Sequence, residues 1–181
     1  MVVLASGAGT TLEALLESPI RASIVAVGSD VPGCPALRLA REAGIETFVV
    51  DPREFSLRSH WDEAIREELR SHQPSWIVAA GFMRILGASV VQAFEYRIVN
   101  VHPSLLPAFP GAHAVRDALQ AGVKITGCTV HFVDEGIDSG PIIAQRAVEV
   151  LPGDDVESLH ARIKVAERGL LIEVLAELAD R

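Results

Sequence analysis

The sequence has few of the residues on which several classes of protein depend. Only Cys34 and Cys128 among its 181 residues are cysteines, too few for a disulfide framework. Acidic residues outnumber basic ones by 24 to 16, and the formal net charge is −8. Because the phosphates of nucleic acid require a basic surface, this charge argues against a general affinity for nucleic acid. An anionic ligand must then be bound by a few well-placed donors.

Long hydrophobic runs are also missing. No apolar run approaches the roughly 18 residues of a membrane-spanning helix, so no membrane association is expected. The amino terminus lacks the basic stretch of a signal peptide. The composition, with 49% hydrophobic and 22% charged residues, is typical of a compact globular protein. We therefore expect one cytoplasmic domain over residues 1–181.

Short apolar runs alternate with helical patterns over the first hundred residues. The runs that predict strands cover residues 2–5, 23–28, 47–50, 76–80 and 97–101, and helices are predicted at 35–43 and 61–71, among others. This order predicts an α/β fold with a doubly wound, mostly parallel sheet. Later, the extended runs 126–133 and 142–150 are joined by a glycine-rich turn and predict an antiparallel pair. Apolar residues at helical spacing from Val156 to Leu178 predict one long carboxyl-terminal helix.

The segment Asn100–Pro107 (NVHPSLLP) combines polar side chains with a stiff loop. If residues 97–101 form a strand, Asn100 and His102 lie on the same side near its carboxyl end, where open α/β sheets bind ligands. A carboxamide and an imidazole side by side can donate two hydrogen bonds to one developing oxyanion. The residues alone leave equally open that these polar groups only cap a loop.

Two other segments each allow two interpretations. An acidic side chain in the turn at 134–141 could orient His102 or move a proton, or it could simply be solvated. The loop SGAGTT (6–11) could hold a phosphate at a helix amino terminus, or it could be a plain turn with Thr10 as the helix N-cap. It lacks both the lysine of a G-x-x-x-x-G-K-[ST] loop and the last glycine of G-x-G-x-x-G.

A metal site is not expected. The six histidines show no ligand motif such as H-E-x-x-H. His131 lies in an apolar run and is interpreted as a histidine of the core.

Five segments together resemble the phosphoribosylglycinamide formyltransferase family. They occur in order along nearly the whole chain and read SGAGTTLEALL (6–16), AGFMRIL (80–86), NVHPSLLPAFPGAHA (100–114), GCTVHFVDEGIDSGPII (127–143) and RIKVAE (162–167). The resemblance implies a single Rossmann-like formyltransferase domain. It further implies transfer of the formyl group of 10-formyltetrahydrofolate, a co-substrate, to the amine of glycinamide ribonucleotide in de novo purine biosynthesis. Both partners are small molecules, no metal takes part, and the existence of a homodimer is left open.

The resemblance also implies roles for individual residues. The catalytic residues are Asn100, His102 and Asp138. The substrate-binding residues are Gly9, Thr10, Thr11, Lys164 and Glu167. The folate-binding residues are Arg58, Met83, Arg84, Ile85, Leu86 and Val133, together with Asn100 and Asp138. The sequence departs from the family pattern at Thr10-Thr11, which replaces the more usual Ser-Asn, and at Arg168-Gly169.

Two alternatives remain beside this function. The Asn-x-His-Pro-Ser-Leu-Leu-Pro core is shared by other folate-dependent formyltransferases, so an enzyme acting on another small amine, such as an amino sugar, is the first. The second is a non-catalytic nucleotide-binding module that uses only the glycine loop, which leaves Asn100, His102 and Asp138 without a role.

Overall fold

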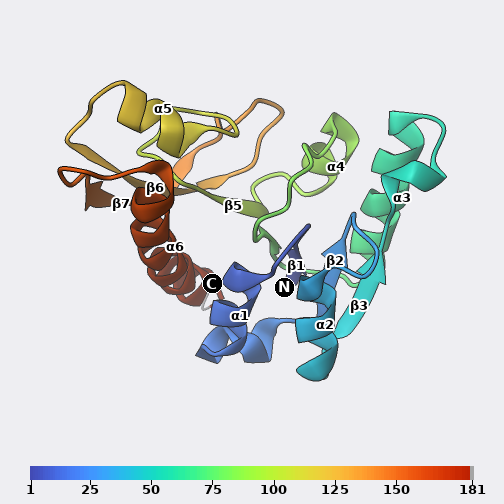
Figure 1. Ribbon diagram of the computed structural model, residues 1–181. Helices are drawn as coiled ribbons and strands as arrows, with labels where there is room; N and C mark the ends of the chain where they lie inside the picture. Colours follow the sequence, from blue (N-terminus) through green and yellow to red (C-terminus); the bar gives the residue numbers. More distant parts are fainter. Residues whose placement is uncertain (180–181) are drawn as a thin grey trace. The chain divides into compact units, whose positions relative to one another are not determined.

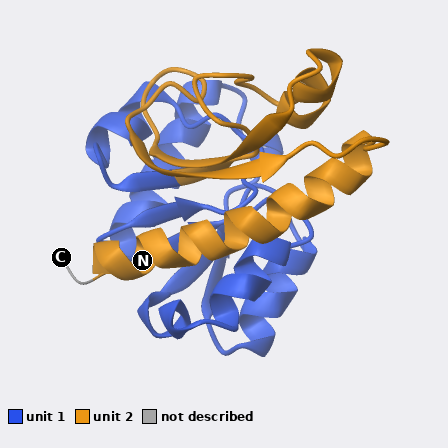
Figure 2. Ribbon diagram, turned by 90° about the vertical axis from the view of Figure 1, so that its left-hand side faces the viewer, with its two compact units in different colours: residues 1–99 blue, residues 100–181 orange. Residues whose placement is uncertain are grey.

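The polypeptide divides after Val99 into two units in the computed structural model, which describes residues 1–179. The first unit is residues 1–99 and the second begins at Asn100 (Figure 2). Strand β5 (Ile98–His102) begins in the first unit and ends in the second.

The first unit is built on parallel strands. These are β1 (Val2–Leu4), β2 (Ala26–Ser29), β3 (Glu46–Val49) and β4 (Ile77–Ala79). Val3 of β1 pairs with Val27 of β2 on one side and with Val78 of β4 on the other. All three residues of β1 and of β4 are buried, as expected for central strands of a parallel sheet.

Helices cover both faces of this parallel sheet. They are α1 (Thr10–Leu16), α2 (Pro35–Glu42), α3 (Arg58–Ser71) and α4 (Ala88–Ala93), with short 3₁₀ helices at η1 (Pro19–Ser23) and η2 (Pro52–Glu54). Helix α1 contacts α2, and α3 contacts α4. In Figure 1 the first pair lies on one side of strands β1 to β3 and the second pair on the other. This is the result expected when every strand–helix–strand crossover is right-handed.

The second unit contains an antiparallel hairpin and the longest helix. Strand β6 (Ile125–Phe132) pairs antiparallel with β7 (Ile142–Glu149), and the register shifts between Val130 and His131. Helices α5 (Ala114–Gln120) and α6 (Val156–Ala179) complete the unit. Helix α6 packs its apolar face against β6 and β7 and runs along the hairpin (Figure 2).

The predicted fold class is confirmed. The strands form one sheet in the order β3-β2-β1-β4-β5-β6-β7, parallel from β3 to β4 and antiparallel between β6 and β7. The helix predicted at residues 35–43 is also found as α2, which has Ala43 as its C-cap and is followed by Gly44 with φ of 73°. No helix within residues 1–179 is long and apolar enough to cross a membrane.

Two local predictions were wrong. The strand expected from residue 23 begins only at Ala26, because Ser18 caps a 3₁₀ turn that has Pro19 at its first position. Thr10 is not the N-cap of α1, since Gly9 occupies that position and Thr10 is the first helical residue. The helices α4 and α5 were not predicted, because each is too short to show a clear helical period.

Candidate active site

Asn100, His102 and Asp138 lie together in the second unit. Asn100 and His102 are on β5, and Asp138 is in the turn between β6 and β7. Nδ1 of His102 lies 3.3 Å from Oδ2 of Asp138, and the His102 side chain is buried. The structure thus brings Asp138 together with two residues, Asn100 and His102, that precede it by 38 and 36 positions.

Both ring nitrogens of His102 have a neighbour. Nε2 lies 2.9 Å from the carbonyl oxygen of Phe109, and because a carbonyl only accepts, Nε2 must carry a hydrogen. Nδ1 faces the Asp138 carboxylate, so a proton on this nitrogen would be shared with a negative charge. Each ring nitrogen of His102 therefore faces an oxygen that can accept a hydrogen bond.

The backbone holds Asp138 in an unusual conformation. Its φ is 51°, in the left-handed region that aspartate tolerates better than most residues. The backbone N–H of Gly111 donates to Oδ2 of Asp138 at 2.8 Å, and this hydrogen bond holds the carboxylate in place. Gly140 closes the same turn, since a Cβ there would lie 1.9 Å from the carbonyl oxygen of Phe132. The position of the Asp138 carboxylate is therefore set by the backbone conformation of its turn and by the N–H of Gly111.

His131 is a fourth member of the cluster that the sequence interpretation missed. It is buried, as expected for a core histidine, but its Nε2 lies 3.2 Å from Nδ2 of Asn100 and 3.7 Å from Oδ1 of Asp138. Its Nδ1 lies 2.9 Å from the carbonyl oxygen of Phe132 and therefore carries the hydrogen, so Nε2 accepts from the Asn100 amide. Burial lowers the pKa of His131, which favours this neutral form. The ring thereby fixes which way the amide of Asn100 points.

The predicted phosphate loop belongs to the first unit. Gly9 has φ of 78°, and a Cβ there would lie 2.8 Å from the Cα of Ala36. Glycine is therefore required both by the backbone conformation and by the packing of this loop on α2. Thr10 and Thr11 follow as the first residues of α1, where backbone N–H groups have no partner within the helix.

The predicted folate segment, residues 83–86, also belongs to the first unit. The side chains of Met83 and Ile85 are exposed, with relative exposures of 80% and 60%, whereas Leu86 is buried. Arg58 donates to the carbonyl oxygen of Ile85 and, at 3.0 Å, to Oδ1 of Asp62. Arg58 therefore contacts the backbone of this segment.

Val133, Lys164 and Glu167 belong to the second unit. Val133 is half-buried and directly follows β6. Lys164 and Glu167 are three residues apart on α6, but Lys164 is exposed whereas Glu167 is buried. Burial raises the pKa of Glu167 to about 7, although the charges of Lys164 and Arg168 act in the opposite direction.

We expect the contribution of Glu167 to the stability of the protein without ligands to fall as the pH rises from about 4.5 to about 7. In this window the unfolded chain has already released the Glu167 proton, while the folded protein retains it. Glu167→Gln removes this penalty, so the variant should be more stable than the wild type at pH 8, with an advantage that shrinks toward pH 4.5. Denaturant unfolding at several pH values measures the difference. Glu177→Gln, an exposed glutamate on the same helix, controls for the lost charge, and a difference independent of pH would contradict the assignment.

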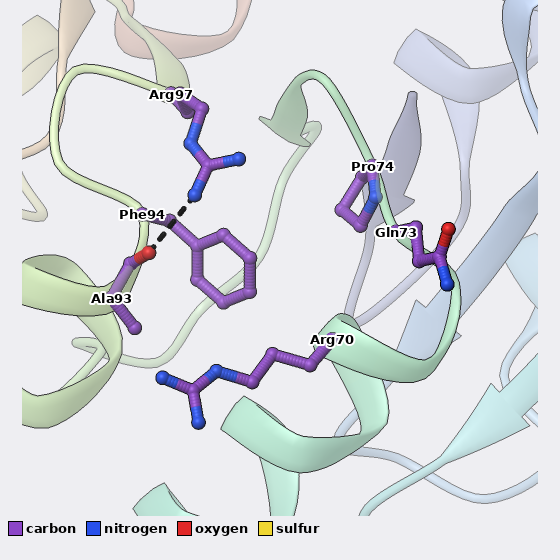
Figure 3. A pocket seen from close by; sticks show the side chains of 6 residues that line it. All are labelled: Arg70, Gln73, Pro74, Ala93, Phe94 and Arg97. Carbon is purple, nitrogen blue, oxygen red and sulfur yellow. Dashed lines mark hydrogen bonds between the residues drawn. The ribbon is translucent and has the colours of Figure 1, made fainter.

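One pocket of the first unit contains none of the predicted site residues. It has a volume of about 250 Å³ and is lined by Arg70, Gln73, Pro74, Ala93, Phe94 and Arg97. The guanidinium of Arg97 lies 5.2 Å from the centroid of the Phe94 ring and donates to the carbonyl oxygen of Ala93 (Figure 3). Pro74 and Arg97 precede strands β4 and β5, and ligands of open α/β sheets bind at the opposite, carboxyl ends. This pocket is therefore not part of the candidate site.

Comparison with known proteins identifies the family. A formyl transferase family model matches residues 1–175. A phosphoribosylglycinamide formyltransferase of Mycobacterium tuberculosis is 51% identical over 182 residues, which cover 99% of this chain and 84% of the relative. The enzyme of the same name from Bacillus subtilis is 41% identical over 180 residues, covering 97% and 92%. The crystal structure of glycinamide ribonucleotide transformylase 1 from Symbiobacterium toebii superposes with a TM-score of 0.92 at 43% identity, covering 96% of this chain and 84% of that one. The resemblance seen in the sequence is confirmed, and the chain belongs to the formyl transferase family.

Proposed function

We propose that this protein transfers the formyl group of 10-formyltetrahydrofolate to the amine of glycinamide ribonucleotide, a step of de novo purine biosynthesis. The names of its relatives support formyl transfer to this ribonucleotide, and the folate donor follows from the resemblance seen in the sequence. The observation that carries the proposal is the cluster of Asn100, His102 and Asp138, whose donors and carboxylate suit acyl transfer. We further propose that residues 1–181 form one formyltransferase domain, that the protein works in the cytoplasm, and that its partners are these small molecules.

The reaction requires a stabilised oxyanion. The amine of the ribonucleotide attacks the formyl carbon, and the carbonyl oxygen of the resulting tetrahedral adduct carries a negative charge. The Asn100 amide has two hydrogens, and since His131 accepts one of them, the other can donate to this oxygen. His102 supplies the second donor once a ring N–H exchanges its contact with Phe109 or Asp138 for the oxyanion.

The reaction also requires proton movement. The attacking nitrogen must lose a proton, and N10 of the folate must gain one as the bond between N10 and the formyl carbon breaks. Asp138 is the carboxylate placed to support a positively charged His102 ring and to move this proton, directly or through water. All bonds formed and broken are accounted for by the two substrates, so a covalent intermediate on the protein is not needed.

The remaining predicted residues would bind the two substrates. Gly9, Thr10 and Thr11 would hold the phosphate with backbone N–H groups, and Lys164 and Glu167 would contact the ribonucleotide. Met83, Arg84, Ile85 and Leu86 of the first unit would bind the folate, with Arg58 holding the carbonyl oxygen of Ile85. Val133 of the second unit would also contact the folate.

The direct test is incubation with 10-formyltetrahydrofolate and a panel of amines. The panel contains glycinamide ribonucleotide, its dephosphorylated riboside and several amino sugars, and products are identified by mass. We expect rapid formylation of the ribonucleotide alone. Preferential formylation of an amino sugar would support the alternative substrate, and the absence of any formylated product would contradict the proposed function.

Activity should survive treatment with a strong chelator. Within residues 1–179 no group of three or more His, Cys, Asp or Glu residues is arranged to hold a metal ion. We therefore expect kcat after dialysis against the chelator to equal that of an enzyme sample dialysed against buffer alone. Loss of activity that is restored by a stoichiometric amount of a divalent ion would contradict the metal-free mechanism.

A further inference from the structure

We propose that Asp30 is a positioning residue for folate binding, which holds the segment 83–86 in place through Ser6 and Arg84. This inference rests on the proposed function, because it takes residues 83–86 to be part of the folate pocket. All the contacts that carry it lie within the first unit.

Ser6 connects the carboxyl ends of three neighbouring strands. It follows β1, while Asp30 follows β2 and Gly81 follows β4, and β1 lies between the other two strands. The N–H of Ser6 donates to the carbonyl oxygen of Gly81 at 3.1 Å. Its Oγ accepts from the N–H of Met83 at 2.8 Å and donates to Oδ1 of Asp30 at 2.5 Å. The start of the folate segment is thus bonded to β1, and through Ser6 to Asp30.

Asp30 holds the next residue of the same segment directly. Nε of Arg84 donates to Oδ2 of Asp30 at 2.9 Å. The Asp30 side chain is 4% exposed, whereas that of Arg84 is 45% exposed. A buried carboxylate needs donors on both oxygens, and here Ser6 and Arg84 supply them. Asp30 is therefore bound to the segment by two routes, through Ser6 to Met83 and directly to Arg84.

This arrangement explains how an exposed segment can keep a defined shape. Met83 and Ile85 expose most of their side chains, so packing of these side chains does little to fix the backbone between them. Hydrogen bonds hold it instead, because Ser6, which is bound to Asp30, accepts from the N–H of Met83, and Asp30 accepts from Arg84. Arg58 adds a contact with the carbonyl oxygen of Ile85. A segment held in its binding conformation before the ligand arrives binds more tightly, because less conformational entropy is lost on binding.

Asp30→Asn is the sharpest variant, because it keeps the shape of the side chain and changes one oxygen into an NH₂ group. An NH₂ group cannot accept a hydrogen bond, so either Ser6 or Arg84 loses its acceptor. Asp51→Asn is the matched control. Asp51 is as buried as Asp30, lies in the same unit, and is paired with an arginine, Arg53, at 2.7 Å. It also lies close enough to Arg84 for the arginine charge to lower its pKa slightly, after the larger effect of hydrogen bonds from Arg53.

We expect Asp30→Asn to raise both the KM for 10-formyltetrahydrofolate and the Kd for tetrahydrofolate about tenfold, within the range of coupling in hydrogen-bonded networks. The value of kcat should stay within about twofold, because Asn100, His102 and Asp138 are untouched. Asp51→Asn should change none of these constants by more than about twofold. Steady-state kinetics and calorimetric titration with tetrahydrofolate measure them, and thermal unfolding compares the stability of the two variants.

A second variant, Ser6→Ala, tests the same network in case Asp30→Asn does not fold. Ser6→Ala removes the hydroxyl that joins Asp30 to Met83, and should weaken folate binding in the same direction. Both changes break the same network. The double variant should therefore raise the Kd for tetrahydrofolate by a smaller factor than the product of the factors of the two single variants. If the wild type binds tetrahydrofolate and Asp30→Asn binds it as tightly as Asp51→Asn does, the positioning role is overturned and the proposed function stands. If the wild type neither binds tetrahydrofolate nor transfers formyl groups, both fall.

Discussion

Replacing His102 or Asn100 by alanine is expected to lower kcat by about 100-fold or more. Each variant removes one donor to the oxyanion of the tetrahedral adduct, a contact that becomes strong only as charge develops. The affinity for tetrahydrofolate should change much less, because the ground state does not contain this charge. This expectation rests on two observations. The Asn100 amide gives one of its two hydrogens to His131, and the ring nitrogens of His102 face Phe109 and Asp138.

The measurement of kcat for His102→Ala needs a control that removes an imidazole elsewhere in the protein. His113→Ala removes an exposed histidine of the same unit, and it should leave kcat near the wild-type value. His102 also bonds the backbone of the following loop through Phe109, so the unfolding temperature of each variant must be compared with that of the wild type. Turnover close to the wild-type rate in both the His102 and the Asn100 variants would remove these residues from the proposed mechanism.

Removing the phosphate of the substrate should have the second large effect. Glycinamide riboside is expected to react with a kcat/KM lower by several powers of ten, because several charge-assisted hydrogen bonds, worth about 1.5–3 kcal/mol each, are lost together. Inorganic phosphate should compete with the ribonucleotide and not with the riboside. The KM for 10-formyltetrahydrofolate, measured at a saturating concentration of each amine, provides the control, and we expect it to be similar with both.

Variants of the loop distinguish backbone from side-chain donors. Thr11→Ala should have a small effect, because the proposed donors are backbone N–H groups at the start of α1. Gly9→Val should be severe, but the structure shows that this variant also clashes with Ala36 and forces an unfavourable φ. The substrate comparison is therefore the decisive measurement. Equal kcat/KM for riboside and ribonucleotide would rule out the phosphate site and favour the amino-sugar alternative.

The predictions from sequence were most accurate where a local pattern has a direct physical cause. A buried parallel strand must be apolar on both faces, so the runs at 2–5 and 76–80 were recognised as strands. The antiparallel hairpin and the long helix α6 were found for similar reasons. Boundaries were less accurate, as at Ala26, because the short-range capping by Ser18 competes with the β-forming tendency of the residues that follow.

The candidate site was predicted only in part. Period-two alternation placed Asn100 and His102 on one side of a strand, and their contacts with His131 and Asp138 agree with this. The roles of His131 and Asp30 were not visible in the sequence. A buried histidine and an aspartate after a strand each have an ordinary structural explanation, and no spacing rule connects them to residues 31 and 54 positions away.

The sequence by itself determined the order of the strands and of the longer helices, the family to which the chain belongs, and the residue types available for the chemistry. These follow from hydrophobic periodicity and from motifs that are read along the chain. Only the tertiary structure decided which nitrogen of His102 faces Asp138, which way His131 turns the Asn100 amide, and how Asp30 holds Arg84. A hydrogen bond is sensitive to changes of a few tenths of an ångström in the donor–acceptor distance and to the angle at the hydrogen. Such geometry arises when distant segments pack together, so it leaves no regular spacing in the sequence.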